Sequence, residues 1–396
     1  MLVIAQHLGV AMESFFASVN NSLYWKTGIC LLIVILTYAE IWVFNNSYAN
    51  DDKSLNVRPV GGKFLYIAAL NVFGALGVVL LHANGIFWSR PQGTLWLSAN
   101  FIETFFYWPV PIFFMITGAT LIDYLQRYDT NIYFKKRIVR TLIPFVFWSL
   151  FACGFNVHYG QSMDWNILHI VSNIFSAAYL NIYWFFPVLF SIYISIPLLS
   201  LIASKQQAFK YVIIVGMITN LSLPLLCNIL HLSWSIRLDV LGGSLIYAIT
   251  GYYLSRTEFS VKQRVVLYIC GAMGWFIHYF GTLVSSAEQS TISTIFKGYS
   301  NFPAFIQAVA VFVLFKYLFE KHQVSEQIKR LIFKFSTLTF GVYLIHWYFL
   351  VVLPRKLSID TGSLMWRIAG AMTVFIISSL IVILIKKIPL IRRAVP

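Results

Sequence analysis

The chemistry open to this sequence depends on a few ionisable side chains within apolar segments. His82 lies near the end of one such segment, and Asn71 lies eleven residues earlier. Eleven residues at about 100° each return to nearly the same helix face, roughly 16 Å along the axis. The residues between them on that face, Gly74, Ala75 and Val78, are small. Small residues also suit a close-packed helix interface, so the pattern allows either such an interface or a narrow polar channel from Asn71 to His82.

A basic cluster forms a second candidate site. After Arg127, the chain continues through Lys135, Lys136, Arg137 and Arg140 into the next apolar segment. Arg137 and Arg140 are three residues apart and therefore share a helix face. Planar guanidinium groups bind phosphate oxygens in pairs, which suits a nucleotide-bearing donor. Five positive charges equally suit a cytoplasmic membrane anchor, so both interpretations stay open.

The composition decides the class of protein that must position these residues. Of the 396 residues, 59% are hydrophobic and 11% are charged. Soluble domains carry about 25% charged residues, so the composition excludes a soluble enzyme, a disordered chain and a disulfide scaffold. The net charge of +15 is typical of lysine- and arginine-rich cytoplasmic loops, and we expect no nucleic-acid partner. The cysteines show no metal-ligand spacing, and we expect no metal.

Long apolar runs predict an all-α polytopic membrane protein, because a hydrocarbon core about 30 Å thick needs roughly 20 apolar residues. Residues 1–20 predict an interfacial helix. If the C-terminus is cytoplasmic and the N-terminus outside, 22 of the 29 lysines and arginines lie on the cytoplasmic side. Eleven spans are predicted, at 28–46, 65–87, 102–123, 141–157, 184–203, 211–230, 239–254, 265–284, 302–319, 336–353 and 364–385.

The order of the motifs resembles the acyltransferase family 3 of bacterial inner-membrane proteins. Leu70 and His82 have the spacing of the family's first helix. The resemblance implies a ten-helix domain at 63–396, preceded at 1–62 by the interfacial segment, an extra helix and a linker. Four further segments match in order: VPIFFMITGATLI at 110–122, FKKRIVRTLIPFVFW at 134–148, YWFFPVLFSIYISIPLL at 183–199 and FGVYLIHWY at 340–348.

Two positions depart from the family pattern. Ala68 and Asn71 stand where family members usually have aspartate and arginine. An asparagine still forms hydrogen bonds but carries no charge. Either the chain belongs to a variant subgroup of the family, or another arginine of the chain takes the role of the family's usual arginine.

The resemblance implies an O-acyltransferase of the bacterial inner membrane. Its donor would be cytoplasmic acetyl-CoA, and its acceptor a hydroxyl group of a cell-surface or lipid-linked glycan. His82 would act as general base on that hydroxyl, or carry the acetyl group as an acyl-imidazole. Glu103 opens a span on the same side and is expected to orient the His82 ring. The expected donor-binding residues are Lys136, Arg137, Arg140 and Arg127, and the expected supporting residues are Asn71, Trp184 and His346.

Two other functional classes fit the sequence. A polytopic, aromatic-rich chain suits a transporter or flippase for a glycolipid. A membrane-bound O-acyltransferase of the unrelated type, whose histidine lies late in the chain, would use His346 in place of His82.

Overall fold

The computed structural model describes residues 18–19, 23–49, 64–89, 93–237, 243–287, 291–321, 324–389 and 391–396. This part of the chain is almost entirely helical, which confirms the all-α prediction. The predicted interfacial helix at 1–20 and the predicted domain boundary at 62–63 fall almost wholly outside the described residues. Strands β1 (Tyr48–Ala49) and β2 (Thr257–Glu258) form a single antiparallel pair in which Tyr48 is opposite Glu258.

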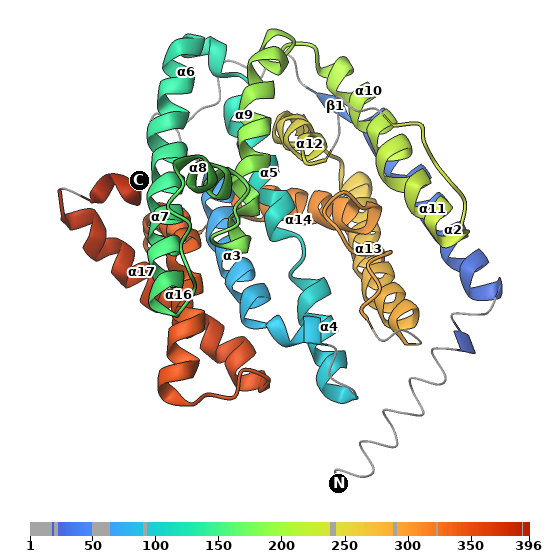
Figure 1. Cartoon of the computed structure of the whole chain (residues 1–396). Helices are drawn as coiled ribbons and strands as arrows, with labels where there is room; N and C mark the ends of the chain where they lie inside the picture. The colour runs from blue at the N-terminus through green and yellow to red at the C-terminus, as the bar shows by residue number, and fades with distance from the viewer. Residues whose placement is uncertain are drawn as a thin grey trace.

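The helices follow one another along the whole chain (Figure 1). The α-helices are α2 (Leu23–Asn46), α3 (Leu65–Ala83), α4 (Thr94–Phe105), α5 (Pro109–Leu121), α6 (Thr130–Arg137), α7 (Ile143–His158), α8 (Ile167–Phe175), α9 (Phe185–Leu201), α10 (Gln206–Gly216), α11 (Leu223–Ile229), α12 (Leu245–Arg256), α13 (Val261–Ser286), α14 (Phe302–Lys321), α15 (Glu326–Ser336), α16 (Thr339–Leu357) and α17 (Ala371–Lys387). Short 3₁₀ or π-helical segments are η2 (Gly85–Ser89), η3 (Tyr124–Gln126), η4 (Ile138–Leu142), η5 (Asn181–Trp184), η6 (Met217–Ser222), η8 (Trp366–Gly370) and η9 (Arg392–Ala394).

Within the described residues, nine helical stretches are long and apolar enough to cross a membrane. A tenth is formed if α15 and α16, which meet at 63°, count as one broken span. Among the described residues, helices of sufficient length are thus found at ten of the eleven predicted positions. The exception is the predicted span 239–254, where α12 has only 12 residues. Such a helix is about 18 Å long, which is shorter than a hydrocarbon core.

Helix α12 is buried and packs against α5. Gly118 of α5 lies so close to α12 that a Cβ there would be 1.8 Å from the carbonyl oxygen of Ala248. Gly251 of α12 meets the backbone of Met115 in the same way, at 2.1 Å. Small residues allow two helix backbones to approach this closely, as is common within membranes.

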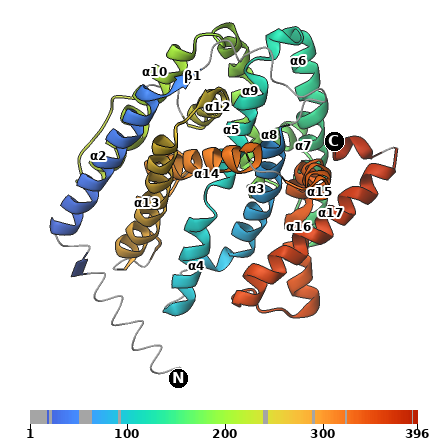
Figure 2. The same cartoon turned by 180° about the vertical axis from the view of Figure 1, so that it is seen from behind.

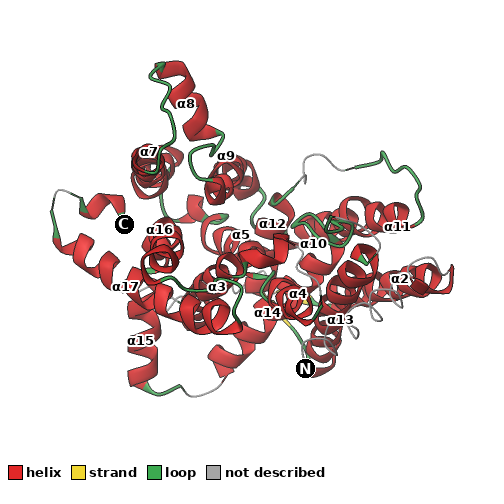
Figure 3. Ribbon diagram, turned by 60° about the horizontal axis from the view of Figure 1, so that its bottom comes forward, coloured by secondary structure: helices red, strands yellow, loops and turns green. Residues whose placement is uncertain are grey.

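Helix α3 lies at the centre of the molecule. It contacts α5, α14, α15, α16 and α17, and these helices surround it in the view of Figure 3. The extra helix α2 lies at one flank, where it packs against α10, α11 and α13 (Figures 2 and 3). Because α3 carries His82 in its last turn, the central position places this histidine among helices from distant parts of the sequence.

Two of the three described π-helical segments contain a residue that lies four positions before a proline. Arg140 in η4 lies four residues before Pro144, and Asn220 in η6 lies four residues before Pro224. A proline has no N–H group, and its ring clashes with the carbonyl group four residues earlier. The helix widens locally to relieve that clash. The third segment, η8, is not followed by such a proline.

Candidate functional site

The predicted histidine of α3 is paired with the late histidine of α16. His82 Nδ1 lies 2.8 Å from His346 Nε2, although the two residues are 264 positions apart. Their rings are nearly parallel, at 7°, with centroids 5.1 Å apart. The Trp347 ring meets the His82 ring edge-on at 5.9 Å. The structure therefore brings the two candidate histidines together in one site.

The direction of the hydrogen bond between the histidines follows from the backbone of α16. His346 Nδ1 lies 3.0 Å from the carbonyl oxygen of Val342 and 2.8 Å from that of Tyr343. Carbonyl oxygens only accept, so Nδ1 of a neutral His346 carries the proton, and its Nε2 carries the lone pair. His82 Nδ1 must then donate to His346. Nε2 of His82 keeps its lone pair, and no described residue bonds to it.

A cavity of about 470 Å³ begins one helical turn from this pair. Val78 lines it, four residues before His82, and so does Tyr343, whose carbonyl group accepts the bond from His346. Asn71 and Arg140 line the same cavity. Helix α3 therefore borders an open space from Asn71 to Val78 and carries the packed histidine pair in its last turn. The other lining residues are mainly apolar: Val110, Phe113, Ile116, Thr117, Thr141, Phe185, Leu189, Tyr193, Thr339, Phe340 and Pro396.

The predicted donor-binding residues differ in their surroundings. Arg140, on η4, is exposed and lines the cavity. Arg137 is half-buried between the rings of Tyr133 and Tyr193, with its guanidinium carbon 5.5 Å from the centre of the Tyr193 ring. Because Tyr193 also lines the cavity, Arg137 lies behind that wall.

The other two predicted donor-binding residues are held by local partners. Lys136 Nζ lies 3.5 Å from the centre of the Tyr128 ring. Arg127 donates to the carbonyl group of Thr120 at 2.7 Å and to Asp123 at 3.0 Å. Asp123 also accepts from Arg256 at 2.6 Å. The described contacts of Arg127 thus belong to a small ion-pair network that holds the start of this basic segment.

Glu103 forms a buried ion pair with Lys297, from the connection between α13 and α14. Lys297 Nζ donates to Glu103 Oε1 at 3.0 Å, and the two side chains are 2% and 6% exposed. Burial lowers the pKa of Lys297, while the Glu103 carboxylate opposes that shift. The ammonium group also lies over the rings of Phe87 and Trp88, at 4.4 and 5.1 Å. The hydrogen bond that orients the His82 ring is the one that His82 donates to His346, and the described partner of Glu103 is Lys297.

Trp184 belongs to a stack of rings beside the same connection. Its ring lies 5.4 Å from that of Tyr299, and Tyr299 stacks on Tyr107 at 4.5 Å. The next residue after Trp184, Phe185, lines the cavity. The stack therefore joins the start of α9 to the 291–301 connection, which carries Tyr299.

A buried arginine that the sequence analysis did not single out lies at the C-terminal end of α3. Arg367 of η8 is 1% exposed, and it donates to Asn84 Oδ1 at 3.3 Å and to Ser98 Oγ at 2.9 Å. Asn84 follows His82 by two residues and also donates to the carbonyl group of Ala99 at 2.9 Å. Arg367 thus ties the end of α3 to α4 and η8. An arginine within an apolar stretch was the signal, since such residues almost always face a protein interior.

Comparison with known proteins gives one family for most of the chain. A family model described as an acyltransferase domain, family 3, matches residues 64–384. No curated protein and no solved structure matches the chain.

Proposed function

This chain belongs to the acyltransferase family 3, and from that premise we propose that it moves an acetyl group from acetyl-CoA to a hydroxyl group of a cell-surface or lipid-linked glycan. The family makes it an acyltransferase, and its apolar helices make it a multi-pass membrane protein. The acetyl donor, the glycan acceptor and the residues that serve each are the proposal.

One observation carries the proposal. His82 Nε2 is the nitrogen of the histidine pair whose lone pair has no described partner, whereas both nitrogens of His346 are engaged. The pair therefore works as an oriented base, in the manner of a histidine held by a third group in a catalytic triad. When His82 Nε2 takes a proton, the positive charge is stabilised by the hydrogen bond to His346 Nε2.

The reaction balances with these residues alone. The acceptor hydroxyl group gives its proton to His82 Nε2 as its oxygen forms a bond to the thioester carbonyl carbon. The carbon–sulfur bond then breaks, and the leaving thiolate takes the proton from His82. The alternative route uses the same nitrogen as nucleophile: it bonds to the thioester carbonyl carbon, the carbon–sulfur bond breaks, and the CoA thiolate leaves. The acceptor oxygen then attacks the acetyl carbon of the acetyl-imidazole, the carbon–nitrogen bond breaks, and the thiolate takes the hydroxyl proton.

The cavity suits the donor. Its mainly apolar lining fits the long arm of a CoA thioester, and Arg140, which lines the same cavity, provides a charged donor for a phosphate group. Arg137 adds positive charge behind the Tyr193 wall. In this proposal the basic segment faces the cytoplasm of a bacterial cell, the protein lies in the inner membrane, and His82 lies toward the outer side.

The late-histidine alternative uses residues of the same site. His346 is in contact with His82, so a substitution at either position disturbs the pair. The backbone bonds of His346 favour His82 as the base, because an imidazole whose Nδ1 and Nε2 both have partners has no free lone pair for a substrate.

Purified protein supplied with acetyl-CoA and a deacetylated glycan from its host tests the proposal. We expect acetyl transfer by the natural protein and a loss of about 10²–10⁴-fold in the His82→Gln variant, because glutamine forms hydrogen bonds but does not act as a base near neutral pH. Rapid acid quenching before glycan is added distinguishes an acetyl-enzyme from direct transfer. Near-normal transfer by a normally expressed His82→Gln protein would contradict the proposed base. A natural protein that neither hydrolyses nor transfers from acetyl-CoA would favour a transporter.

A further inference from the structure

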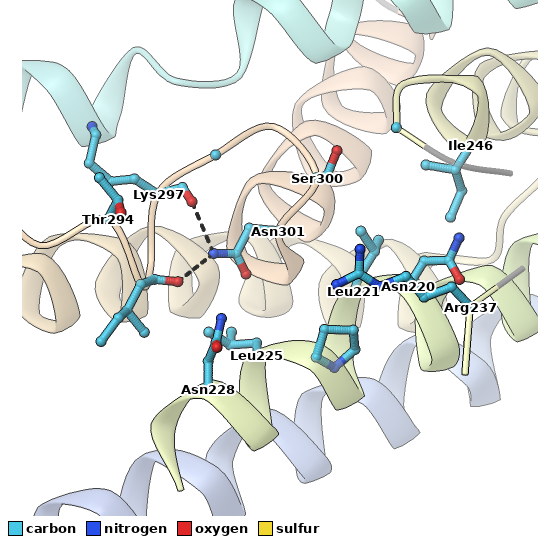
Figure 4. Close-up of a pocket in the computed structure, with 14 residues that line it drawn as sticks. Asn220, Leu221, Leu225, Asn228, Arg237, Ile246, Thr294, Lys297, Ser300 and Asn301 are labelled. Atoms are coloured by element: carbon cyan, nitrogen blue, oxygen red, sulfur yellow. Dashed lines mark hydrogen bonds between the residues drawn. The ribbon is translucent and has the colours of Figure 1, made fainter. Parts of the chain in front are cut away.

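A second cavity, of about 380 Å³, lies between the η6–α11 segment and the 294–301 connection (Figure 4). It shares no lining residue with the cavity beside the histidine pair. In the predicted orientation, the connections that border it face outside. The lining residues are Asn220, Leu221, Pro224, Leu225, Asn228, Arg237, Gly243, Ile246, Thr294, Ile295, Lys297, Gly298, Ser300 and Asn301.

The polar groups of this pocket divide into two kinds. Asn301 holds the connection itself: its amide nitrogen donates to the carbonyl groups of Ile295 at 2.8 Å and Lys297 at 3.3 Å, and its oxygen accepts from the backbone of Phe302 at 2.9 Å (Figure 4). The Lys297 ammonium group points away from the pocket toward α4, where Glu103 binds it. The polar groups of Asn301 and Lys297 are therefore bound within the protein, and these two side chains have a structural role in the pocket.

The second kind is open to a ligand. Asn228, on α11, and Thr294 and Ser300, on the connection opposite, are exposed, and no described residue bonds to their side-chain polar atoms. Asn220, on the π-helical segment η6, also lines the space from the α11 side, and its side-chain oxygen accepts a hydrogen bond from the Thr219 hydroxyl group at 2.8 Å. π-helical turns occur often at functional sites, and Pro224 explains this one. Amide and hydroxyl groups thus lie on both sides of the space.

The chemistry of these side chains suits a sugar as the ligand of the pocket. Amide and hydroxyl side chains both donate and accept, as the hydroxyl groups of a sugar require. Leu221, Leu225 and Ile246 provide an apolar wall for the carbon face of a ring. Among the described lining residues there is no carboxylate that would bind a cation, and Arg237 provides the one exposed guanidinium group. A polyphosphate ligand would need several cationic groups.

The pocket is linked to the histidine pair through the 294–301 segment. This segment lines the pocket, and its Lys297 side chain lies over the rings of Phe87 and Trp88, which follow His82 along the chain. The two histidines do not line the pocket. A sugar in the pocket is therefore a different residue of the acceptor from the one whose hydroxyl group reacts.

We propose that this pocket binds a glycosyl residue of the acceptor chain, remote from the residue that is acetylated. The inference rests on the proposed function, since it assigns the acceptor of that reaction a second point of attachment. It makes the enzyme selective for oligosaccharides over single sugars.

The test compares a long and a short acceptor in the double variant Asn228→Leu/Thr294→Val. The long acceptor is a deacetylated oligosaccharide released from the host's own surface glycan. The short acceptor is the unacetylated methyl glycoside of the one sugar that the enzyme acetylates in that glycan. We expect the KM of the oligosaccharide to rise about 5- to 100-fold, as the loss of two hydrogen bonds implies. The KM of the methyl glycoside and the hydrolysis of acetyl-CoA without acceptor should stay at natural values. Thr291→Val, an exposed change on the same connection but outside the pocket, is the matched control.

The outcomes separate the two proposals. If the natural protein and the double variant transfer acetyl groups to the oligosaccharide with equal KM, the pocket is not an acceptor site and the proposed function stands. If the natural protein does not use acetyl-CoA, the proposed function itself fails. Should the double variant not fold, the single Thr294→Val variant is measured in the same way, and an unchanged oligosaccharide KM there overturns the pocket proposal.

Discussion

The two nitrogens of a histidine ring have different roles, and at the scale of single residues the helix backbone decides which is which. His346 Nδ1 is bonded to carbonyl groups of its own helix, three and four residues earlier, and this fixes the tautomer of His346 and, through it, that of His82. The spacing of Asn71 and His82 predicted a shared helix face. The pairing of His82 with His346 was beyond the sequence, because nothing local indicates a contact across 264 positions.

Removal of His346 should be milder than removal of His82. The His346→Ala variant keeps the base but loses the group that orients it and stabilises its charge, so we expect kcat to fall while the KM for acetyl-CoA stays near its natural value. The His82→Ala variant should lose activity almost completely. Steady-state kinetics of both purified variants check this order. An inactive His346→Ala protein beside an active His82→Ala protein would reverse the assignment.

The Glu103–Lys297 pair can be tested as a unit. Glu103→Gln leaves the buried ammonium group of Lys297 without its partner, and we expect a loss of roughly 3–5 kcal/mol in the free energy of unfolding. The double variant Glu103→Gln/Lys297→Met removes both charges and should recover most of that loss. Thermal unfolding in detergent measures stability, and acetyl transfer measures function. A stable double variant without activity would mean that Glu103 takes part in the chemistry, as the sequence suggested.

At the scale of elements, two of the three π-helical segments could have been found from the sequence. Arg140 and Asn220 each lie four residues before a proline inside an apolar run, at the position whose carbonyl group the proline ring displaces. Both residues line a cavity. The segment that contains Arg367 has no such proline, and its shape depends on packing that only the folded molecule provides.

The contact between α5 and α12 predicts a sharp difference between two glycines. Gly118→Ala forces a methyl group into the backbone of Ala248, so the helices must separate and we expect a large loss of stability or failure to insert. Gly154→Ala, in α7, has no atom within 4 Å of the new methyl group and should be neutral or stabilising by up to about 1 kcal/mol. Expression level and melting temperature in detergent compare them. Equal behaviour of the two variants would exclude a tight α5–α12 contact.

At the scale of the whole molecule, composition and apolar runs predicted an all-α polytopic protein, and ten of the eleven predicted spans have counterparts among the described helices. The exception is α12, because hydropathy measures whether a segment is apolar and not whether it faces lipid or protein. Residue 239 and its neighbours, where that span was predicted to begin, lie outside the described residues. The order of motifs likewise predicted the family, while the cavities depend on residues that only the tertiary structure brings together.

The distribution of lysine and arginine residues predicts the orientation of the chain in the membrane. Thr130 begins α6 at one end of the α6–η4–α7 segment, and Ser162 follows its other end. With the basic segment inside, a membrane-impermeant thiol reagent added to intact cells should label Ser162→Cys and not Thr130→Cys in a background without the four natural cysteines. Permeabilised cells provide the control, in which both are labelled. Labelling of Thr130→Cys alone would place the basic segment outside the cell and would contradict the proposed cytoplasmic side for the donor and outer side for the acceptor.

The π-helical segments also affect how this chain compares with its relatives. A π turn closes its hydrogen bonds over five residues where an α turn uses four, so each segment holds one residue more than a straight helix of equal length. Deleting one residue at 138–142 or 217–222 would restore the regular α-helical spacing and leave the later side chains of that helix on the faces they have now. In an alignment of the family we therefore expect single-residue gaps to fall at these places, and relatives that carry such a gap to have lost the cavity-lining side chain with it.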